Sequence, residues 1–507
     1  MDDKVIVTNE SALRAKYGSS GLRQVKAAVR ALTAADKARG LGTRYVALDD
    51  ARTMRGFRGT PVTSVMNCRQ NKDAVDAVWN ALQPAYLMIL GSYDVVPHQD
   101  LRNPAHAAGD DPDPTAEGDL PYACAGPYSR DAAQFVGPTR VVSRLPDETG
   151  ASDPDLLVRL LDTATRWVPR PDADDRAYFG LSAAVWRQST ELSLSNVFGG
   201  AVQVNLAPPR GPRYPAATLA PRMHFINCHG AESDPHFYGE PGDFPVSLST
   251  PEIQQKIVEG TVAAVECCYG GQLYPAVKLG LDPPICQSYL AQGAYAYFGS
   301  TTIAYGPAEG NGAADLITQY FLMNILDGAS VGHAALVARQ QYVAQTGQMD
   351  PIDLKTLGQF CVYGDPSVHP VTVASATSLP ANMDTVAAGR LARGERRLKL
   401  AATGRFLQDV KPTAGKPARP ARPHGVVLQV LTRIAAEIGI AAGGFRSYAV
   451  RQKGGARTGK TLSPANRYHV LVSVPATARD DRFVRRVAIV AKEAGHRIVG
   501  YRVYYAR

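Results

Sequence analysis

The sequence predicts an α/β protein with two tandem, mostly parallel sheets flanked by helices, followed by a small α+β C-terminal domain. Two observations lead to this prediction. Short apolar segments with the length of buried strands alternate with longer segments in which apolar residues recur at helical spacing. A stretch rich in Ala, Pro, Arg and Lys then separates these segments from a shorter series of helix and strand patterns.

Residues 1–170 form the first α/β series, an N-terminal subdomain. Its expected strands are Lys4–Thr8, Tyr45–Leu48, Tyr86–Leu90 and Arg140–Ser143. Its expected helices are Ser11–Arg39, Asp73–Leu82 and Asp153–Val168, the last of which is stopped by Pro169. Strands that alternate with helices form parallel sheets covered on both faces, and ligand-binding side chains follow the carboxyl ends of such strands.

Residues 171–373 form the second α/β series, and this series contains the reactive residues. Its expected strands are Met223–Asn227, Thr261–Glu266 and Ala294–Gly299. The expected helices that follow them are Ala313–Leu326 and Val331–Thr346. Each of the three strands runs into a Gly, Cys or His at its carboxyl end, which is where a parallel sheet places functional side chains.

Residues 374–423 have the composition of a basic, Pro- and Ala-rich linker, and residues 424–507 form a small basic domain. The pattern in this domain is helix, strand, strand, helix, strand. The corresponding segments are Val426–Ile438, Phe445–Arg451, Tyr468–Val474, Asp481–Ala494 and Arg497–Tyr505.

The net charge of +9 hides a division of the chain into parts of opposite sign. Residues 385–507 contain 25 Lys and Arg against 6 Asp and Glu, a charge of +19, and the remainder carries −10. We therefore expect a regulatory or anionic partner at the C-terminal domain. The basic, Gly-rich segment Arg451–Lys460 fits a solvated hairpin, or a loop that docks on nucleic acid or an acidic partner.

The rest of the composition favours a cytoplasmic protein. No stretch of 18 apolar residues is present, so no membrane span is expected, and the acidic N-terminus lacks the basic start of a secretion signal. The seven cysteines show no regular spacing, which argues against a disulfide framework. Free thiols in a reducing compartment can act as nucleophiles.

Two strand ends carry the chemistry. The segment HFINCHGAE places His229 and Gly230 just after an apolar strand, and VAAVECCYGG places Cys267 and Cys268 just after the next one. A thiol needs a base that removes its proton and an acid that protonates a leaving amine, and histidine supplies both. Neighbouring parallel strands would bring the two ends to one edge of a sheet, where Gly-flanked backbone N–H groups form an oxyanion hole.

In these blocks the sequence resembles the gingipain-type cysteine peptidases of the caspase, legumain and clostripain group. That group has a strand followed by His-Gly and a later strand followed by Ala-Cys-x-x-Gly. VECCYGG matches the second element with Cys268 as the nucleophile; a register one residue earlier, on Cys267, also fits. Further blocks that resemble the family occur in order along residues 1–373: YLMILGSYDVVP, GDLPYA, TRVVSRLP, YFGSTT and VYGDPSVHP.

The resemblance implies a caspase-like catalytic unit and a Cys-His dyad that hydrolyses peptide bonds. Cys268 would be the nucleophile, His229 the acid and base, and the N–H groups of Gly230 and Cys268 the oxyanion hole. No cofactor and no metal are implied. A metal site made of Cys228, His229, Cys267 and Cys268 is an alternative, but it lacks Cys-x-x-Cys spacing.

The acidic loop Asp110–Asp119 has three interpretations: a solvated loop, a calcium site, and a specificity determinant. The third follows from the resemblance, because arginine-directed gingipains carry an Asp at the base of the specificity pocket. Asp119 occupies that position, with Tyr122 three residues on, and Ser300 lies in the Ser-Thr strand end. A protein substrate with a basic cleavage site is therefore expected, Arg before Lys.

Two expectations concern the C-terminal part. The alternative to an enzyme is a catalytically silent caspase-like scaffold that binds an anionic partner or nucleic acid through its basic domain. If the chain is a peptidase, the basic unit is expected to cover an acidic pocket of the catalytic part. It would then restrain or target the enzyme, and cleavage at an arginine between Arg390 and Arg422 would release it.

Overall fold

The structure is a computed structural model of the chain. It describes residues 2–106, 109–171, 176–373, 385–417, 423, 425–441, 444–451, 467–475 and 485–507. Most of the segment Arg451–Lys460 therefore lies outside the described residues, as do Arg419 and Arg422. Among the described residues, no helix combines the length and the apolar character that a membrane crossing requires.

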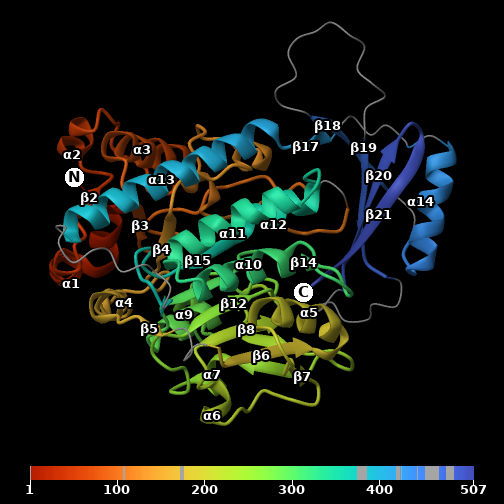
Figure 1. Cartoon of the computed structure of the whole chain (residues 1–507), viewed down its shortest axis with the longest axis horizontal. Coiled ribbons are helices and arrows are strands. Elements are labelled where there is room, and N and C mark those ends of the chain that lie inside the picture. Colours follow the sequence, from red (N-terminus) through yellow and green to blue (C-terminus); the bar gives the residue numbers. More distant parts are fainter. Residues whose placement is uncertain are drawn as a thin grey trace, which may run out of the picture.

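A ten-stranded sheet is the centre of the molecule, with strand order β2-β1-β3-β4-β15-β13-β12-β8-β6-β7 (Figure 1). In that order the strands are Thr43–Ala47, Lys4–Thr8, Tyr86–Leu90, Val142–Leu145, Phe360–Tyr363, Ala296–Ser300, Val262–Val265, Met223–Asn227, Tyr178–Ala183 and Asn205–Ala207. Most of the sheet is buried on both faces, which is why its strands are short runs of apolar residues without polar alternation.

The expectation of two tandem sheets is corrected by this topology. The strands β2, β1, β3, β4 and β15 are parallel to one another, and so are β13, β12, β8, β6 and β7. The two sets meet at the antiparallel pair β13–β15, which joins them into one continuous sheet. Short apolar patterns indicate which segments form buried strands, but not which strands pair with each other. The sequence therefore could not show that the two series form one sheet.

Helices cover both faces of this sheet, and the strands alternate between two cores. On one face lie α1 (Glu10–Ala38), α4 (Asp155–Arg166) and α9 (Ile285–Ala291); on the other lie α10 (Ala314–Leu326), α11 (Val331–Gln345) and α12 (Pro351–Gln359). Along β12, Ala263 and Val265 belong to the first core, whereas Val262 and Ala264 belong to the second.

Polar side chains cap two helices on the second face of the sheet. Ser330 caps α11 by accepting a hydrogen bond from the N–H of His333. Asp350 and Asp353 form a reciprocal capping box at α12, with Pro351 in the first turn. These caps fix the starts of two of the helices that cover the second core.

The C-terminal unit contains an antiparallel sheet of six strands in the order β14-β21-β20-β19-β18-β17. The strands are Tyr305–Gly306, Arg497–Ala506, Val487–Ala494, Arg467–Ser473, Arg446–Arg451 and Thr413–Pro417. Helix α14 (Gly425–Glu437) packs on one face of this sheet, and the other face contributes Val470, Val472 and Val490 to the second core. The helix expected over Asp481–Ala494 is wrong for the described part, because residues Val487–Ala494 form β20. Alternate residues of this strand pack on opposite faces of the sheet, Val487, Ile489 and Ala491 toward α14 and Ala488 and Val490 toward the second core.

The expected linker also differs from the structure. Residues Thr385–Val410 form the helix α13, which packs against α11 (Figure 1). Gln408 accepts a hydrogen bond from the N–H of Gly137 at 3.1 Å, and Arg393 pairs with Asp3 at 3.2 Å. The Ala- and Arg-rich composition that indicated a linker is equally that of a helix with good intrinsic propensity.

Candidate active site

The site lies where β8 and β12 end side by side. These strands are parallel neighbours, with Val265 opposite Ile226, and the N–H of Glu266 continues the ladder to the carbonyl of Ile226 at 2.9 Å. His229 and Gly230 follow β8, and Cys268 follows β12. A Cβ atom on Gly230 would collide with the carbonyl oxygen of Cys268, so only glycine allows the two loops to approach this closely.

The two adjacent cysteines occupy opposite sides of the sheet. Cys267 belongs to the first core, where its sulfur accepts a hydrogen bond from the N–H of Cys228 at 3.3 Å. Cys268 belongs to the second core, and its sulfur lies 3.5 Å from the carbonyl oxygen of Ala304. The alternation of β12 continues through Glu266, so the Glu266 and Cys268 side chains follow the same face of the sheet.

Backbone N–H groups at Cys268 and Gly230 bind the main chain of Arg507, the last residue of the printed sequence. The N–H groups of Cys268 and Gly230 both donate to the main-chain oxygen of Arg507, at 3.1 and 3.4 Å. Two backbone donors that converge on one oxygen beside a thiol have the arrangement of an oxyanion hole.

The segment that ends in Arg507 lies in the site as an extended strand. Within β21 and β14, Ala506 is opposite Tyr305 and Tyr505 is opposite Gly306 in antiparallel register. The N–H of Arg507 donates to the carbonyl of Ala304 at 3.0 Å, the same carbonyl that the Cys268 thiol contacts. A peptide is bound here by addition to the edge of a sheet.

The side chain of Arg507 is 1% exposed and enters a closed acidic pocket. Its Nη2 donates to Asp315 at 2.9 Å and to the carbonyl of Pro307 at 2.7 Å, and its guanidinium lies 4.4 Å from the ring centre of Trp186. A Cβ on Gly306 would collide with the guanidinium. The pocket therefore combines a carboxylate, a carbonyl and an aromatic face, which suits an arginine.

Glu266 gives the pocket a second carboxyl group, 4.0 Å from Nε of Arg507. Burial and the charge of Asp315 raise the pKa of Glu266 well above its usual value, and burial also raises the pKa of Asp315. Two buried carboxyl groups next to each other resist ionisation unless a cation lies between them. The positive charge of Arg507 opposes the rise of both pKa values without cancelling it.

His229 is positioned by a carboxylate and by aromatic rings. Its Nε2 lies 2.8 Å from Oε2 of Glu240, and the ring packs against Trp186 and Phe244. Burial lowers the pKa of His229, an effect that the bond to Glu240 opposes. The imidazole is therefore neutral at pH 7, and because Nε2 faces Glu240, Nδ1 is the nitrogen left to take up a proton.

Burial also governs Cys268. It raises the pKa of the thiol to about 12, although the charge of Lys355 favours the thiolate. In the structure as it stands, with the segment 505–507 over the site, Cys268 is a protonated thiol.

Asp119, Tyr122 and Ser300, the expected substrate-binding residues, are not brought to this pocket. Asp119 binds Arg144 through both oxygens, at 2.6 and 2.9 Å, and His98 at 3.1 Å. The hydroxyl of Tyr122 donates to the carbonyl of Pro97, and that of Ser300 to the carbonyl of Thr302. Within the described residues none of the three contacts Arg507, because their hydrogen bonds are made inside the fold.

The acidic loop supports the site without entering the pocket. Lys355 donates to Asp111 at 2.6 Å and to Asp113 at 3.2 Å. Asp111 also accepts from the hydroxyl of Tyr305, and Asp113 from the N–H of Ile303 at 2.9 Å. These carboxylates fix the segment that leads into β14, and Lys355 already occupies the position that a calcium ion would need.

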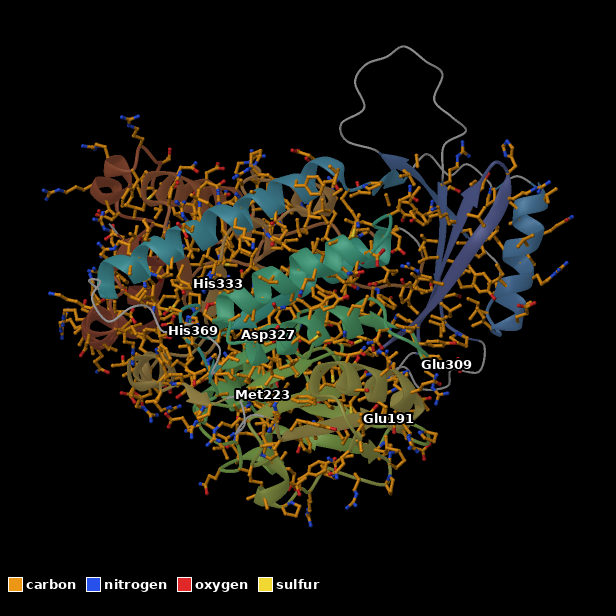
Figure 2. The ribbon with its side chains drawn as sticks, viewed as in Figure 1. Glu191, Met223, Glu309, Asp327, His333 and His369 are labelled. Atoms are coloured by element: carbon orange, nitrogen blue, oxygen red, sulfur yellow. The ribbon has the colours of Figure 1, made fainter. Side chains whose placement is uncertain are left out.

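The described residues contain one group with metal-ligand spacing, formed by His98, Asp119 and Cys361. The Asp119 carboxylate of that group is already paired with Arg144, so a metal ion bound there would be repelled by the guanidinium. Cys228, His229, Cys267 and Cys268 do not form such a group in the described part of the chain. Figure 2 shows His369 on the opposite side of the molecule from Glu309 and the C-terminal strands, and its Nδ1 lies 3.0 Å from the carbonyl oxygen of Gly328.

Comparison with known proteins gives distant structural likenesses only. No protein family matches the sequence, and no curated protein matches it. A solved structure described as a protease is similar over 99% of this chain and 96% of its own, with 14% identity and a TM-score of 0.47. Two Saccharomyces cerevisiae separase–securin complexes match 45% and 47% of this chain and 14% of theirs, with 13% and 12% identity and TM-scores of 0.30 and 0.27.

Sequence reasoning missed four residues of the site: Trp186, Glu240, Asp315 and Arg507. Trp186 follows β6, Glu240 follows a short hairpin strand, and Asp315 stands in the first turn of α10. No local pattern distinguishes these residues from surface or helix-start residues. Glu266 did carry a signal, because its spacing of two from Cys268 places both on one face of a strand.

Proposed function

We propose that the chain is a cysteine endopeptidase that cleaves peptide bonds after arginine, and less readily after lysine. Cys268 is the nucleophile, and His229 is the acid and base. The observation that carries the proposal is the placement of Arg507, whose carbonyl oxygen is held by two backbone N–H groups beside the thiol while its guanidinium fills an acidic pocket.

The chemistry is acyl transfer in two steps. His229 takes the proton of the Cys268 thiol at Nδ1, and the sulfur attacks the carbonyl carbon of the substrate arginine. The oxyanion is bound by the N–H groups of Gly230 and Cys268. As the C–N bond breaks, His229 returns the proton to the leaving amine. Water, activated by the neutral imidazole, then hydrolyses the thioester, which releases the carboxylate and restores the thiol.

Glu240 supports His229 in both protonation states. As a carboxylate it accepts the Nε2 proton, which fixes the tautomer, and it stabilises the imidazolium that forms during the reaction. Asp315, Glu266 and Trp186 select the residue before the scissile bond. A lysine reaches the same carboxylates as a point charge but makes fewer of the hydrogen bonds that a guanidinium makes.

The decisive experiment is covalent labelling with an arginyl chloromethylketone, followed by peptide mapping. Selective alkylation of Cys268, faster than with the leucyl analogue, is the expected result, and Cys267→Ala should be labelled in the same way. Equal labelling by the arginyl and leucyl reagents would contradict the arginine preference, and labelling of Cys268 in neither wild type nor Arg507→Ala would indicate the scaffold of the alternative hypothesis.

A further inference from the structure

The C-terminal strand is both part of the small domain and a ligand of the active site. β21 pairs with β20 over most of its length, from Arg497 opposite Ala494 to Tyr505 opposite Val487. Its end then passes β14 and places Arg507 at Cys268. We infer that the segment Tyr505–Ala506–Arg507, here named the tail, is an internal inhibitor that occupies the site and that a substrate must displace.

The tail uses every element that a substrate would need. It occupies the strand edge at β14, the two oxyanion donors and the arginine pocket at the same time. A substrate peptide bound in the same mode needs the same carbonyl, the same N–H groups and the same carboxylates. Occupation by the tail and by substrate is therefore mutually exclusive.

The remainder of the C-terminal unit holds the tail in place. Tyr448 donates to the carbonyl of Pro104 at 3.0 Å, and the N–H of Asp110 donates to Val472 at 3.1 Å. Arg485 binds Glu240, the partner of His229, at 2.7 Å. A segment tethered this closely has an effective concentration of about a millimolar, so a weak ligand suffices to fill the site.

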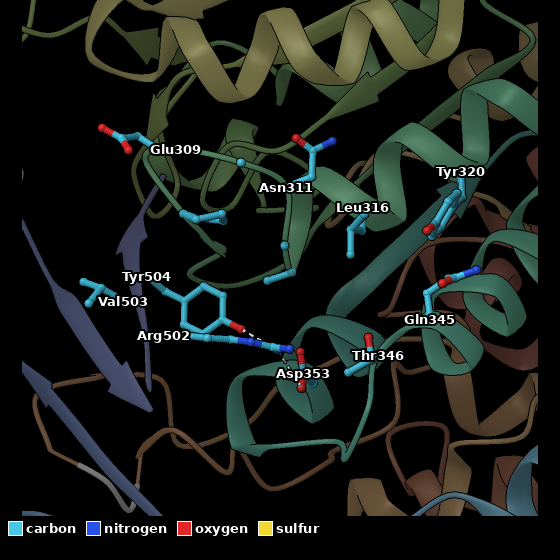
Figure 3. Close-up of a pocket in the computed structure, with 14 residues that line it drawn as sticks. Glu309, Asn311, Leu316, Tyr320, Gln345, Thr346, Asp353, Arg502, Val503 and Tyr504 are labelled. Atoms are coloured by element: carbon cyan, nitrogen blue, oxygen red, sulfur yellow. Dashed lines mark hydrogen bonds and ion pairs between the residues drawn. The ribbon is translucent and has the colours of Figure 1, made fainter. Parts of the chain in front are cut away.

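The flank of β21 near the tail is loosely packed. A cavity of about 550 Å³ separates Arg502, Val503 and Tyr504 from the start of α10 and from α12 (Figure 3). Arg502 reaches across this space to Asp353 over 3.9 Å. Within the tail only Tyr505 packs against the core between the C-terminal sheet and α14, so release of the tail breaks the contacts of its three residues and leaves the rest of that core in place.

The experiment measures how fast iodoacetamide alkylates Cys268, because this small reagent needs no arginine pocket. Wild type is compared with two variants of the tail, Arg507→Ala and Arg507→Glu. The new charge in Arg507→Glu is repelled by Asp315 and Glu266. The control is Arg497→Ala, which changes an exposed arginine of the same strand. Alkylation should accelerate on the order of 10²-fold in both Arg507 variants, since a buried ion pair is lost, and stay at the wild-type rate in the control.

The second arm adds the tail back as a peptide. The heptapeptide YRVYYAR should protect Cys268 in Arg507→Ala at millimolar concentration, and the same peptide ending in Ala should not. The inference rests on the proposed function, but the two fail differently. Equal alkylation of Cys268 in all four proteins overturns the inhibitor and leaves the peptidase standing. Alkylation of Cys268 in none of them overturns both.

Discussion

The N–H of Cys268 donates a hydrogen bond of 3.1 Å to the main-chain oxygen of Arg507. Residues 239 positions apart in the sequence thus meet as nucleophile and acyl group would meet in a peptidase.

Asp315 should set the preference for arginine. Asp315→Asn removes the partner of a buried guanidinium, a loss of about 3–5 kcal/mol, and should lower kcat/KM on an arginyl coumarylamide by roughly 10²–10³-fold. The control is Asp327→Asn at the opposite, exposed end of the same helix (Figure 2). A ratio of Arg to Leu cleavage that is the same in Asp315→Asn and wild type would contradict the assignment.

An extension after Arg507 should be removed by the chain itself. If a short reporter peptide is fused to Arg507, its first bond lies at the Cys268 thiol, and intact mass should show its loss at the same rate over a range of protein concentrations. Cys267→Ala should trim as wild type does, because that thiol faces the opposite core. Cys268→Ala should keep the reporter; trimming by this variant would remove Cys268 from the reaction.

His229 and Glu240 should differ in the size of their effects. His229→Ala should slow reporter trimming by roughly 10²–10⁴-fold, the usual contribution of general acid–base catalysis. Glu240→Gln retains a hydrogen bond but not the charge, so a smaller loss and a lower apparent pKa of the imidazole are expected. The comparison is a pH–rate profile, and an unchanged profile in Glu240→Gln would exclude it as the partner.

The pH dependence of Cys268 alkylation should report on the tail. Burial raises the pKa of this thiol to about 12, so the wild-type rate should still be rising at pH 10. In Arg507→Ala the thiol is exposed, and the rate should level off near the ordinary cysteine range of about 8–9. Profiles that coincide would show that the tail does not cover the thiol.

Asp119 should act on stability. Asp119→Asn leaves Arg144 buried without a counter-ion and should cost about 3–5 kcal/mol in the free energy of unfolding. Burial alone would lower the pKa of His98, but the charge of Asp119 outweighs it and raises the pKa to about 9. The stabilisation by protonated His98 is therefore complete below about pH 6.5 and is lost as the pH rises through 9.

Chemical denaturation of wild type and His98→Gln between pH 6 and 10 measures this effect. The difference in unfolding free energy should be largest at pH 6 and should shrink toward pH 10. A pH-independent difference would contradict the protonation of His98, and an Asp119→Asn variant of normal stability but altered substrate preference would return Asp119 to the specificity role.

The sequence predicted the elements around the site well, because they are governed by local rules. The segments MHFIN and TVAAVE were predicted as neighbouring strands, and β8 and β12 are neighbours with the expected His and Cys at their ends. Strand alternation also separates Cys267 from Cys268, an argument that needs only the sequence and one assigned strand.

The parts that the sequence did not predict depend on packing between distant segments. Arg507 fills the pocket, and the carboxylate that it binds there, Asp315 of α10, lies 192 residues earlier in the sequence. Asp119 was assigned to specificity by resemblance, but Arg144 from β4 neutralises it. Neither pairing leaves a local pattern, because an ion pair between distant segments constrains only the charge at each position.

The position of β14 at the edge of the C-terminal sheet has a consequence for solubility. Its two residues pair on one side with the tail, and β14 ends the strand order of that sheet. When the tail leaves, the hydrogen-bonding groups of Tyr305 and Gly306 become an open edge that can recruit an extended segment of any chain. The tail-free protein should therefore self-associate at high concentration unless substrate covers that edge.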